Sequence, residues 1–127
     1  MDATKRNKII YWIATIWLAL GMVSTGIVQL IKLEEEVEVI NALGFPTYLL
    51  TILGVWKILG TIAVLLPKLP LLKEWAYAGF FFAMTGAAIS HLIVGDEIIT
   101  LFGPILLVAL TIISWYFRPN SRKLIQN

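Results

Sequence analysis

Four long apolar runs dominate the sequence, and short polar or proline-containing segments separate them. The runs cover residues 9–31, 47–66, 75–94 and 98–117. Each run has about the 20 residues that an α-helix needs to cross the ~30 Å hydrocarbon core of a bilayer. Lipid offers no partner to the peptide groups, so each run must satisfy its own backbone hydrogen bonds as a helix. The pattern predicts an all-α, polytopic membrane protein with four transmembrane helices.

The connections between the runs predict an antiparallel bundle. Residues 67–70 carry a proline at each end and residues 95–97 are short and polar, so both segments should form tight turns. Short connections make sequential helices antiparallel neighbours. The first connection is longer and predicts a short amphipathic helix lying on the membrane surface in the outer loop. The apolar positions with helical spacing in this connection are Leu33, Val37, Ile40 and Leu43.

The first run leaves a second interpretation open, a cleaved secretory signal. A basic segment at residues 5–8 precedes it, and Ala19-Leu20-Gly21 resembles a cleavage site. The apolar run, however, continues ten residues beyond Gly21 to Ile31. This length favours an uncleaved transmembrane helix.

Composition agrees with a lipid environment and excludes several kinds of chemistry. Of the 127 residues, 59% are hydrophobic and 14% are charged, whereas soluble domains carry about 25% charged residues. The sequence has no cysteine, which excludes disulfides, cysteine–zinc sites and thiol catalysis. A single histidine gives no basis for a metal site, and a net charge of +2 gives none for nucleic acid. The length fits one domain, residues 1–127.

The distribution of basic residues predicts the orientation. Eight lysines and arginines flank the runs on one side, and only Lys32 lies on the other. Because basic residues stay on the cytoplasmic side, we expect a multi-pass protein of the cell membrane with both termini in the cytoplasm. The eight are Lys5, Arg6, Lys8, Lys68, Lys73, Arg118, Arg122 and Lys123. The aromatic residues expected to anchor this side at the interface are Tyr11, Trp12, Trp75, Tyr77, Trp115, Tyr116 and Phe117.

Small residues gather on one face of three of the runs. Such faces let helix backbones approach closely in lipid, so we interpret them as contacts within the bundle. The alternative is a cavity left beside the missing side chains. The third run carries Ala76, Gly79, Ala83, Gly86, Ala87 and Ser90, the first Gly21, Ser24 and Thr25, and the fourth Thr100, Gly103, Pro104, Thr111 and Ser114.

Lys57 is the principal candidate functional residue because it lies near the middle of an apolar run. It is ten residues from Thr47 and nine from Leu66, about 14 Å from either end at 1.5 Å per residue. A lysine can snorkel over only part of that distance, and a charge at the bilayer centre costs at least about 2.5–3.5 kcal/mol. We therefore expect its amine to bond across the bundle rather than to Thr51 or Thr61 of its own polar stripe. A structural role and a ligand or proton site both remain open.

His91 and Gln29 are two further candidates near the outer ends of their runs. With Glu34, Glu36 and Asp96 they are expected to line an outward-facing polar pocket. Histidine is also the side chain whose ordinary charge change falls near physiological pH. The alternative for His91 is a hydrogen-bonded packing residue.

Tyr77 and Glu74 complete the candidate set at the inner end of the third run. Tyr77 shares a helical stripe with His91 beside the small-residue face. Glu74 is suited to the positive end of its helix dipole and is one candidate partner for Lys57, with distance as the objection. No Ser–His–Asp set, Walker loop or paired interior carboxylates are found, so we expect no intrinsic catalysis.

Three segments resemble the DoxX-like family of small four-helix membrane proteins. They are GVWKILG at 54–60, LPKLPLLKEWAYAGF at 66–80 and AAISH at 87–91. Length and helix count extend the resemblance over the whole chain, whereas residues 33–44 carry no family signal. Relatives are associated with thiosulfate:quinone oxidoreductase as a small membrane subunit, with oxidative-stress complexes, or with a chaperone for receptor channels. The resemblance therefore implies a fold but does not choose among these functions.

Residues and resemblance together lead us to expect a binding module for a lipophilic small molecule such as a quinone, or an accessory membrane subunit of a redox complex. The expected ligand contacts are Lys57, His91, Gln29, Thr61, Tyr77 and Glu74. At most the chain would be accessory to an oxidoreductase. The alternative is a non-enzymatic membrane chaperone or assembly factor that packs against client transmembrane helices. Besides the bilayer, a membrane protein partner or a second copy of the chain stays open, and no nucleic acid is expected.

Overall fold

All regular secondary structure in the computed structural model, which describes residues 2–123, is helical. This confirms the predicted all-α class. In chain order the elements are α1 (Ala3–Leu30), α2 (Glu34–Ala42), α3 (Leu49–Leu65), α4 (Pro70–Val94), the 3-10 helix η1 (Ile98–Leu101), α5 (Phe102–Tyr116) and the 3-10 helix η2 (Asn120–Arg122).

Three helical segments are long and apolar enough to cross a membrane. They are Ala3–Leu30, Pro70–Val94 and Ile98–Tyr116. The fourth apolar helix, α3, has 17 residues and rises about 25 Å at 1.5 Å per residue, slightly less than a typical hydrocarbon core. The predicted second span is thus helical over a shorter stretch than 47–66, and four membrane crossings stay a prediction.

Two helices begin earlier than the apolar pattern predicts, because polar or proline residues suit a helix start. The Asp2 carboxylate accepts a hydrogen bond from the backbone N–H of Lys5 at 2.8 Å, which caps α1. α4 begins at Pro70 instead of Trp75, and proline fits the first position of a helix because the N–H that it lacks would be unpaired there. The turn before it holds Leu69 in the left-handed region at φ 55°.

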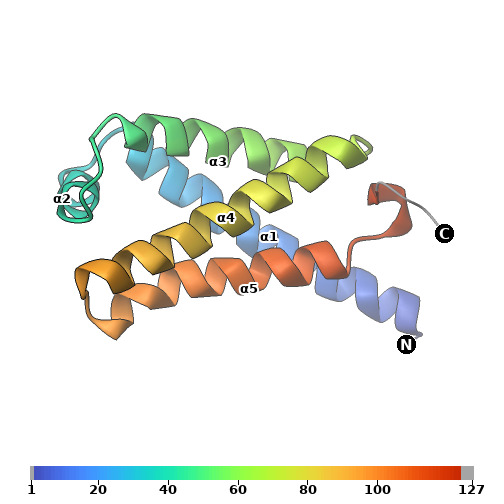
Figure 1. Ribbon diagram of the computed structural model, residues 1–127. Coiled ribbons are helices and arrows are strands. Elements are labelled where there is room, and N and C mark those ends of the chain that lie inside the picture. The colour runs from blue at the N-terminus through green and yellow to red at the C-terminus, as the bar shows by residue number, and fades with distance from the viewer. Residues whose placement is uncertain (1, 124–127) are drawn as a thin grey trace.

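The four long helices form a ring in which each packs against two others. α1 contacts α3 and α5, and α4 contacts the same two helices. Both ends of the chain and the α3–α4 turn lie at one end of the molecule, which we call the basic end because residues 5–8, 68–73 and 118–123 lie there (Figure 1). α2 and the α4–α5 connection lie at the opposite, acidic end, which carries residues 34–38 and 96–97 (Figure 1).

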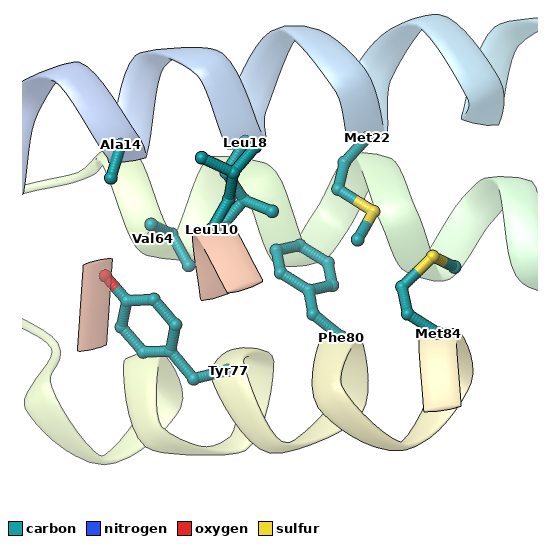
Figure 2. Packing of buried hydrophobic residues seen from close by; sticks show 8 residues of the cluster. All are labelled: Ala14, Leu18, Met22, Val64, Tyr77, Phe80, Met84 and Leu110. Carbon is teal, nitrogen blue, oxygen red and sulfur yellow. The ribbon is translucent and has the colours of Figure 1, made fainter. Parts of the chain in front are cut away.

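The apolar core draws side chains from all four long helices (Figure 2). On α3 and α4, Val64 and Tyr77 lie near the turn at the basic end, whereas Met84 lies near the middle of α4. The helix segments nearer the acidic end surround a cavity. The core side chains are Ala14, Leu18, Met22, Val64, Tyr77, Phe80, Met84 and Leu110.

Glycines of α1 and α3 make a close contact between these two helices. A Cβ added at Gly54 would lie 2.6 Å from Leu30 Cγ and 2.8 Å from the carbonyl oxygen of Gly26. Both distances are too short for any real side chain, so α1 and α3 approach at a place where only glycine fits. Close approach of this kind supplies the dispersion contacts that hold helices together in lipid.

The small-residue face of α4 was predicted to make such contacts, and its members differ in this respect. Ala76 and Ala83 pack against the apolar core. A Cβ added at Gly79 or Gly86 would meet no atom within 4 Å. Gly103 on α5 is equally open, whereas a Cβ at Gly21 on α1 would lie 2.8 Å from Leu107. The alternative interpretation, a cavity beside the missing side chains, fits Gly79 and Gly86.

Lys73 and Arg122 cap the C-terminal end of α3 by hydrogen bonds to its last carbonyl groups. From the sequence, both residues were expected only as basic residues that flank the apolar runs. The Lys73 amine donates to the carbonyl of Ala63 at 2.6 Å and to that of Leu66, and its side chain is 1% exposed. Arg122 donates to the Val64 carbonyl at 2.9 Å. Cations at a helix C-terminus satisfy its unpaired carbonyls and favour its dipole.

Two of the aromatic residues predicted as interfacial anchors are core residues. Tyr11 and Tyr77 are buried, so they cannot contact the headgroup region from the bundle surface. Trp75 and Tyr116 are exposed at the basic end, as the prediction requires. A tyrosine near the end of an apolar run suits either place, and only its face on the helix decides between them.

Candidate functional site

A cavity of about 400 Å³ lies at the acidic end, between the five α-helices. We call it the polar cavity, because it combines a mostly apolar wall with several convergent polar groups. α2 closes one side of it through Glu36, Val39, Ile40 and Leu43. The polar side chains that line it are Thr25, Gln29, Glu36, Lys57, Ser90 and His91.

Lys57 lines this cavity from α3 and is 6% exposed. Its amine donates to Thr25 Oγ1 of α1 at 3.2 Å, a contact across the bundle of the predicted kind. A lysine ammonium carries three N–H donors, and within residues 2–123 it forms no ion pair. The amine therefore keeps donor capacity for a further acceptor.

Gln29 lines the same cavity from α1 and is 9% exposed. Its Oε1 is buried and has no hydrogen-bond partner among the described residues. A buried polar atom without a partner costs about 1–3 kcal/mol, so native proteins rarely leave one. An amide oxygen of this kind is a vacant acceptor in the cavity wall.

His91 lines the cavity from the C-terminal turn of α4, where its Nδ1 lies 2.7 Å from the Asp96 carboxylate. Asp96 thereby orients the imidazole ring but does not itself line the cavity. Of the expected outward-facing pocket, the structure brings Gln29, Glu36 and His91 together. Glu34 lies elsewhere, in a depression on the outer side of α2.

Thr61 and Tyr77 lie away from the polar cavity. The Thr61 hydroxyl donates to the carbonyl of Lys57 in its own helix at 2.7 Å. The Tyr77 hydroxyl lies 2.8 Å from Ser114 Oγ, which lies 2.6 Å from Thr15 Oγ1. This network joins α4, α5 and α1 inside the core.

Glu74 is not a partner of Lys57. Its carboxylate accepts a hydrogen bond from Trp115 Nε1 at 2.9 Å and pairs with Arg118 at 2.9 Å. These contacts tie α4 to α5 and to the segment that follows it, at the basic end. Glu74 therefore lies too far from Lys57 to pair with it, which was the objection raised from the sequence.

A second cavity, the apolar groove, lies between α3 and α4 and has a volume of about 670 Å³. Among the described residues that line it, Lys57 is the one charged side chain. Trp56 and Trp75 flank the groove and are 66% and 64% exposed, so it opens on the outer surface of the bundle. Ala76, Gly79 and Ala83 of the small-residue face line this groove, where the sequence allowed a cavity as the alternative to helix contacts.

Thr25, the hydrogen-bond partner of Lys57, was not singled out from the sequence as a site residue. It was noted among the small residues of the first run, and small hydroxyl residues in an apolar helix are known interhelical donors and acceptors. Its pairing with Lys57 depends on how α1 and α3 are rotated against each other. That rotation follows from the Gly26–Gly54 contact, which links residues far apart in the sequence.

Comparison with known protein families identifies the family to which the chain belongs. The model of the DoxX-like family matches residues 13–114, from the first turns of α1 to near the end of α5. No curated protein and no solved structure is similar enough to the chain to count as a match. The matched region contains every residue of the polar cavity and of the apolar groove. The chain is a membrane protein of the DoxX-like family.

Proposed function

We propose that the chain binds a lipophilic small molecule with a polar head, such as a quinone, in the polar cavity. It would act alone or as an accessory membrane subunit of a redox complex. The observation that carries this proposal is that the vacant acceptor of Gln29 and the Lys57 side chain line the same, otherwise mostly apolar cavity. Known small-molecule sites have this composition and volumes of about 300–1,000 Å³.

Quinone chemistry fits the donors and acceptors available. A quinone carbonyl accepts hydrogen bonds, so it suits the free donors of Lys57. A quinol hydroxyl donates, so it suits Gln29 Oε1. His91, held by Asp96, offers its second ring nitrogen as a further contact to the head group.

The proposed setting is a bilayer crossed by all four long helices, with the basic end in the cytoplasm. Support comes from the basic residues, which gather at the end of the molecule that holds both termini (Figure 1). The polar cavity would then lie in the outer half of the membrane. A bound head group would sit below the outer interface, with α2 above it.

The alternative, an assembly factor, receives less support from the same geometry. It requires the small-residue face of α4 to be free for a client helix. That face instead borders cavities: Gly79 lines the apolar groove and Gly86 the polar cavity. The open space beside Gly86 lies between the helices in the polar cavity, and it favours a small ligand over a client helix.

The test is ligand retention and thermal stabilisation of the purified protein in detergent. Mass spectrometry should find a quinone or a related amphiphile that copurifies, and a tailless benzoquinone should raise the melting temperature. A ligand at one hundred times its Kd stabilises by about 2.7 kcal/mol, which corresponds to a shift of several degrees. Lys57→Met and Gln29→Leu should abolish the shift.

Lys5→Met is the matched control, because Lys5 is an exposed lysine near the start of α1. This variant should retain the full shift. An unchanged melting temperature of the wild-type protein with every quinone tried, together with no copurified amphiphile, would contradict the proposal.

A further inference from the structure

We infer that the molecule bound in the polar cavity carries a long hydrocarbon tail, which lies in the apolar groove and enters sideways from the bilayer between α3 and α4. This inference rests on the proposed function and adds the class of ligand: an amphiphile with a compact polar head and an extended tail. The tail of the same molecule, rather than a client helix or a bulk phospholipid, is the occupant.

The first argument is that the two cavities share a wall. Leu53, Lys57 and Ala83 line both of them. The Lys57 amine donates to Thr25 of α1, and the same residue lines both cavities. A head group that accepts a hydrogen bond from this amine would therefore place the rest of the molecule at the entrance of the groove.

The second argument is the shape and direction of the groove. Along α3 it extends from Leu53 to Leu66, about 20 Å at 1.5 Å per residue. It thus runs from the middle of the bundle toward the basic end, away from the head-binding groups. An extended chain fits this form, whereas a compact molecule would leave most of the groove empty.

The third argument is the contrast between the two linings. Several charged and polar groups converge on the polar cavity, but the groove offers mainly aliphatic and aromatic side chains beyond Lys57. The groove has free space beside Gly79, because a Cβ added at this residue would meet no atom within 4 Å. A hydrocarbon tail is the ligand part that needs no polar partner.

The fourth argument is access. Trp56 and Trp75, which flank the groove, are 66% and 64% exposed on the outer face of the helices that would contact lipid. A tail gains little hydrophobic free energy by moving from lipid into protein, since lipid is equally apolar. The groove would therefore guide and orient the ligand, while the polar cavity would supply most of the selectivity.

The experiment uses a quinone whose tail ends in a photoreactive diazirine, applied to the protein in bilayer nanodiscs. After irradiation, peptide mass spectrometry should locate the label on residues 56–66 of α3 and 72–80 of α4. An excess of the same quinone without the diazirine should compete it away. Gly79→Leu, which fills the groove, should reduce this labelling at least fivefold while a tailless benzoquinone still shifts the melting temperature.

Two variants on the same helix serve as controls. Ala78→Leu places the same side chain at an exposed position outside both cavities, and it should leave labelling unchanged. Gly86→Leu fills the polar cavity instead, so it should abolish the shift with the tailless quinone as well as the labelling of the groove.

Several outcomes would overturn the inference and leave the proposed function standing. Labelling spread over all lipid-facing helices, or labelling of the groove that Gly79→Leu does not reduce, would remove the tail from the groove. Equal labelling by a diazirine phospholipid that the tailed quinone cannot compete away would make the groove a bulk-lipid site. Failure of both the tailless and the tailed quinone to bind the wild-type protein, with no copurified amphiphile, would instead contradict the proposed function itself.

Discussion

At the scale of single residues, two groups of buried polar side chains differ in how far their hydrogen bonds are satisfied. Thr15, Ser114 and Tyr77 satisfy one another by hydrogen bonds within the core. Gln29 and Lys57 leave hydrogen-bonding capacity unused and face a cavity. Because an unpaired buried polar group is costly, the first group stabilises the fold and the second is the expected place for a ligand.

The core network predicts graded losses of stability. Ser114→Ala removes both hydrogen bonds of Ser114 Oγ and leaves two buried hydroxyls without that partner. We expect it to lower the free energy of unfolding by about 1–2 kcal/mol, near the upper range for interhelical hydrogen bonds in membranes. Tyr77→Phe should cost less, about 0.6 kcal/mol, because Ser114 keeps Thr15. Unfolding in mixed micelles with rising SDS measures both, and equal losses would contradict the network.

Lys57→Met separates the two roles left open by the sequence. It keeps the length of the side chain but removes the amine that donates to Thr25. If that hydrogen bond mainly joins α1 to α3, stability should fall by about 1–2 kcal/mol. Our proposal expects a smaller loss together with complete loss of quinone binding, measured by the same unfolding assay and by the thermal shift. Normal binding with a large loss of stability would make Lys57 a structural residue.

At the scale of elements, the sequence predicted where helices form better than how they face one another. Apolar runs and prolines indicated every long helix, since lipid leaves the backbone few alternatives. The pattern could not tell a glycine that permits close contact from one beside empty space. Gly54 and Gly79 both lie within apolar runs, yet only Gly54 touches another helix. Packing of that kind depends on residues distant in the sequence.

The residues of the candidate site could also be predicted from the sequence only in part. Gln29, Glu36, Lys57 and His91 were all chosen from the sequence, because a polar residue in or beside an apolar run is costly and needs a reason. All four line one cavity. Glu74 satisfied the same criterion but pairs with Arg118 at the other end of the molecule, a contact that only the three-dimensional arrangement reveals.

The difference between the two glycines gives a prediction for helix packing. Gly54→Ala would place a methyl group 2.6 Å from Leu30 Cγ and 2.8 Å from a backbone oxygen. α1 and α3 must then separate, and overpacking of this kind costs about 1–3 kcal/mol. Gly79→Ala adds the same methyl group to open space and should not lower stability. The melting temperatures of the two variants should therefore differ by several degrees, and similar values would contradict the packing described for α1 and α3.

At the scale of the whole molecule, the separation of charge between the two ends is the feature that relates the fold to a membrane. Basic residues gather beside both termini and the α3–α4 turn, and acidic residues gather at α2 and the α4–α5 connection (Figure 1). An even number of crossings is needed to place both termini on one side. The 17 residues of α3 are therefore the critical segment, because the number of crossings depends on whether α3 spans the bilayer.

Cysteine labelling on either side of α3 tests this topology directly. The sequence contains no cysteine, so each introduced thiol gives an unambiguous signal. Glu35→Cys lies before α3 at the acidic end and Lys68→Cys after it at the basic end, and both positions are exposed. By the positive-inside rule, an impermeant maleimide should label position 35 in intact cells and position 68 only after permeabilisation. The reverse pattern would invert the orientation, whereas labelling of both positions from one side would mean that α3 does not cross the membrane.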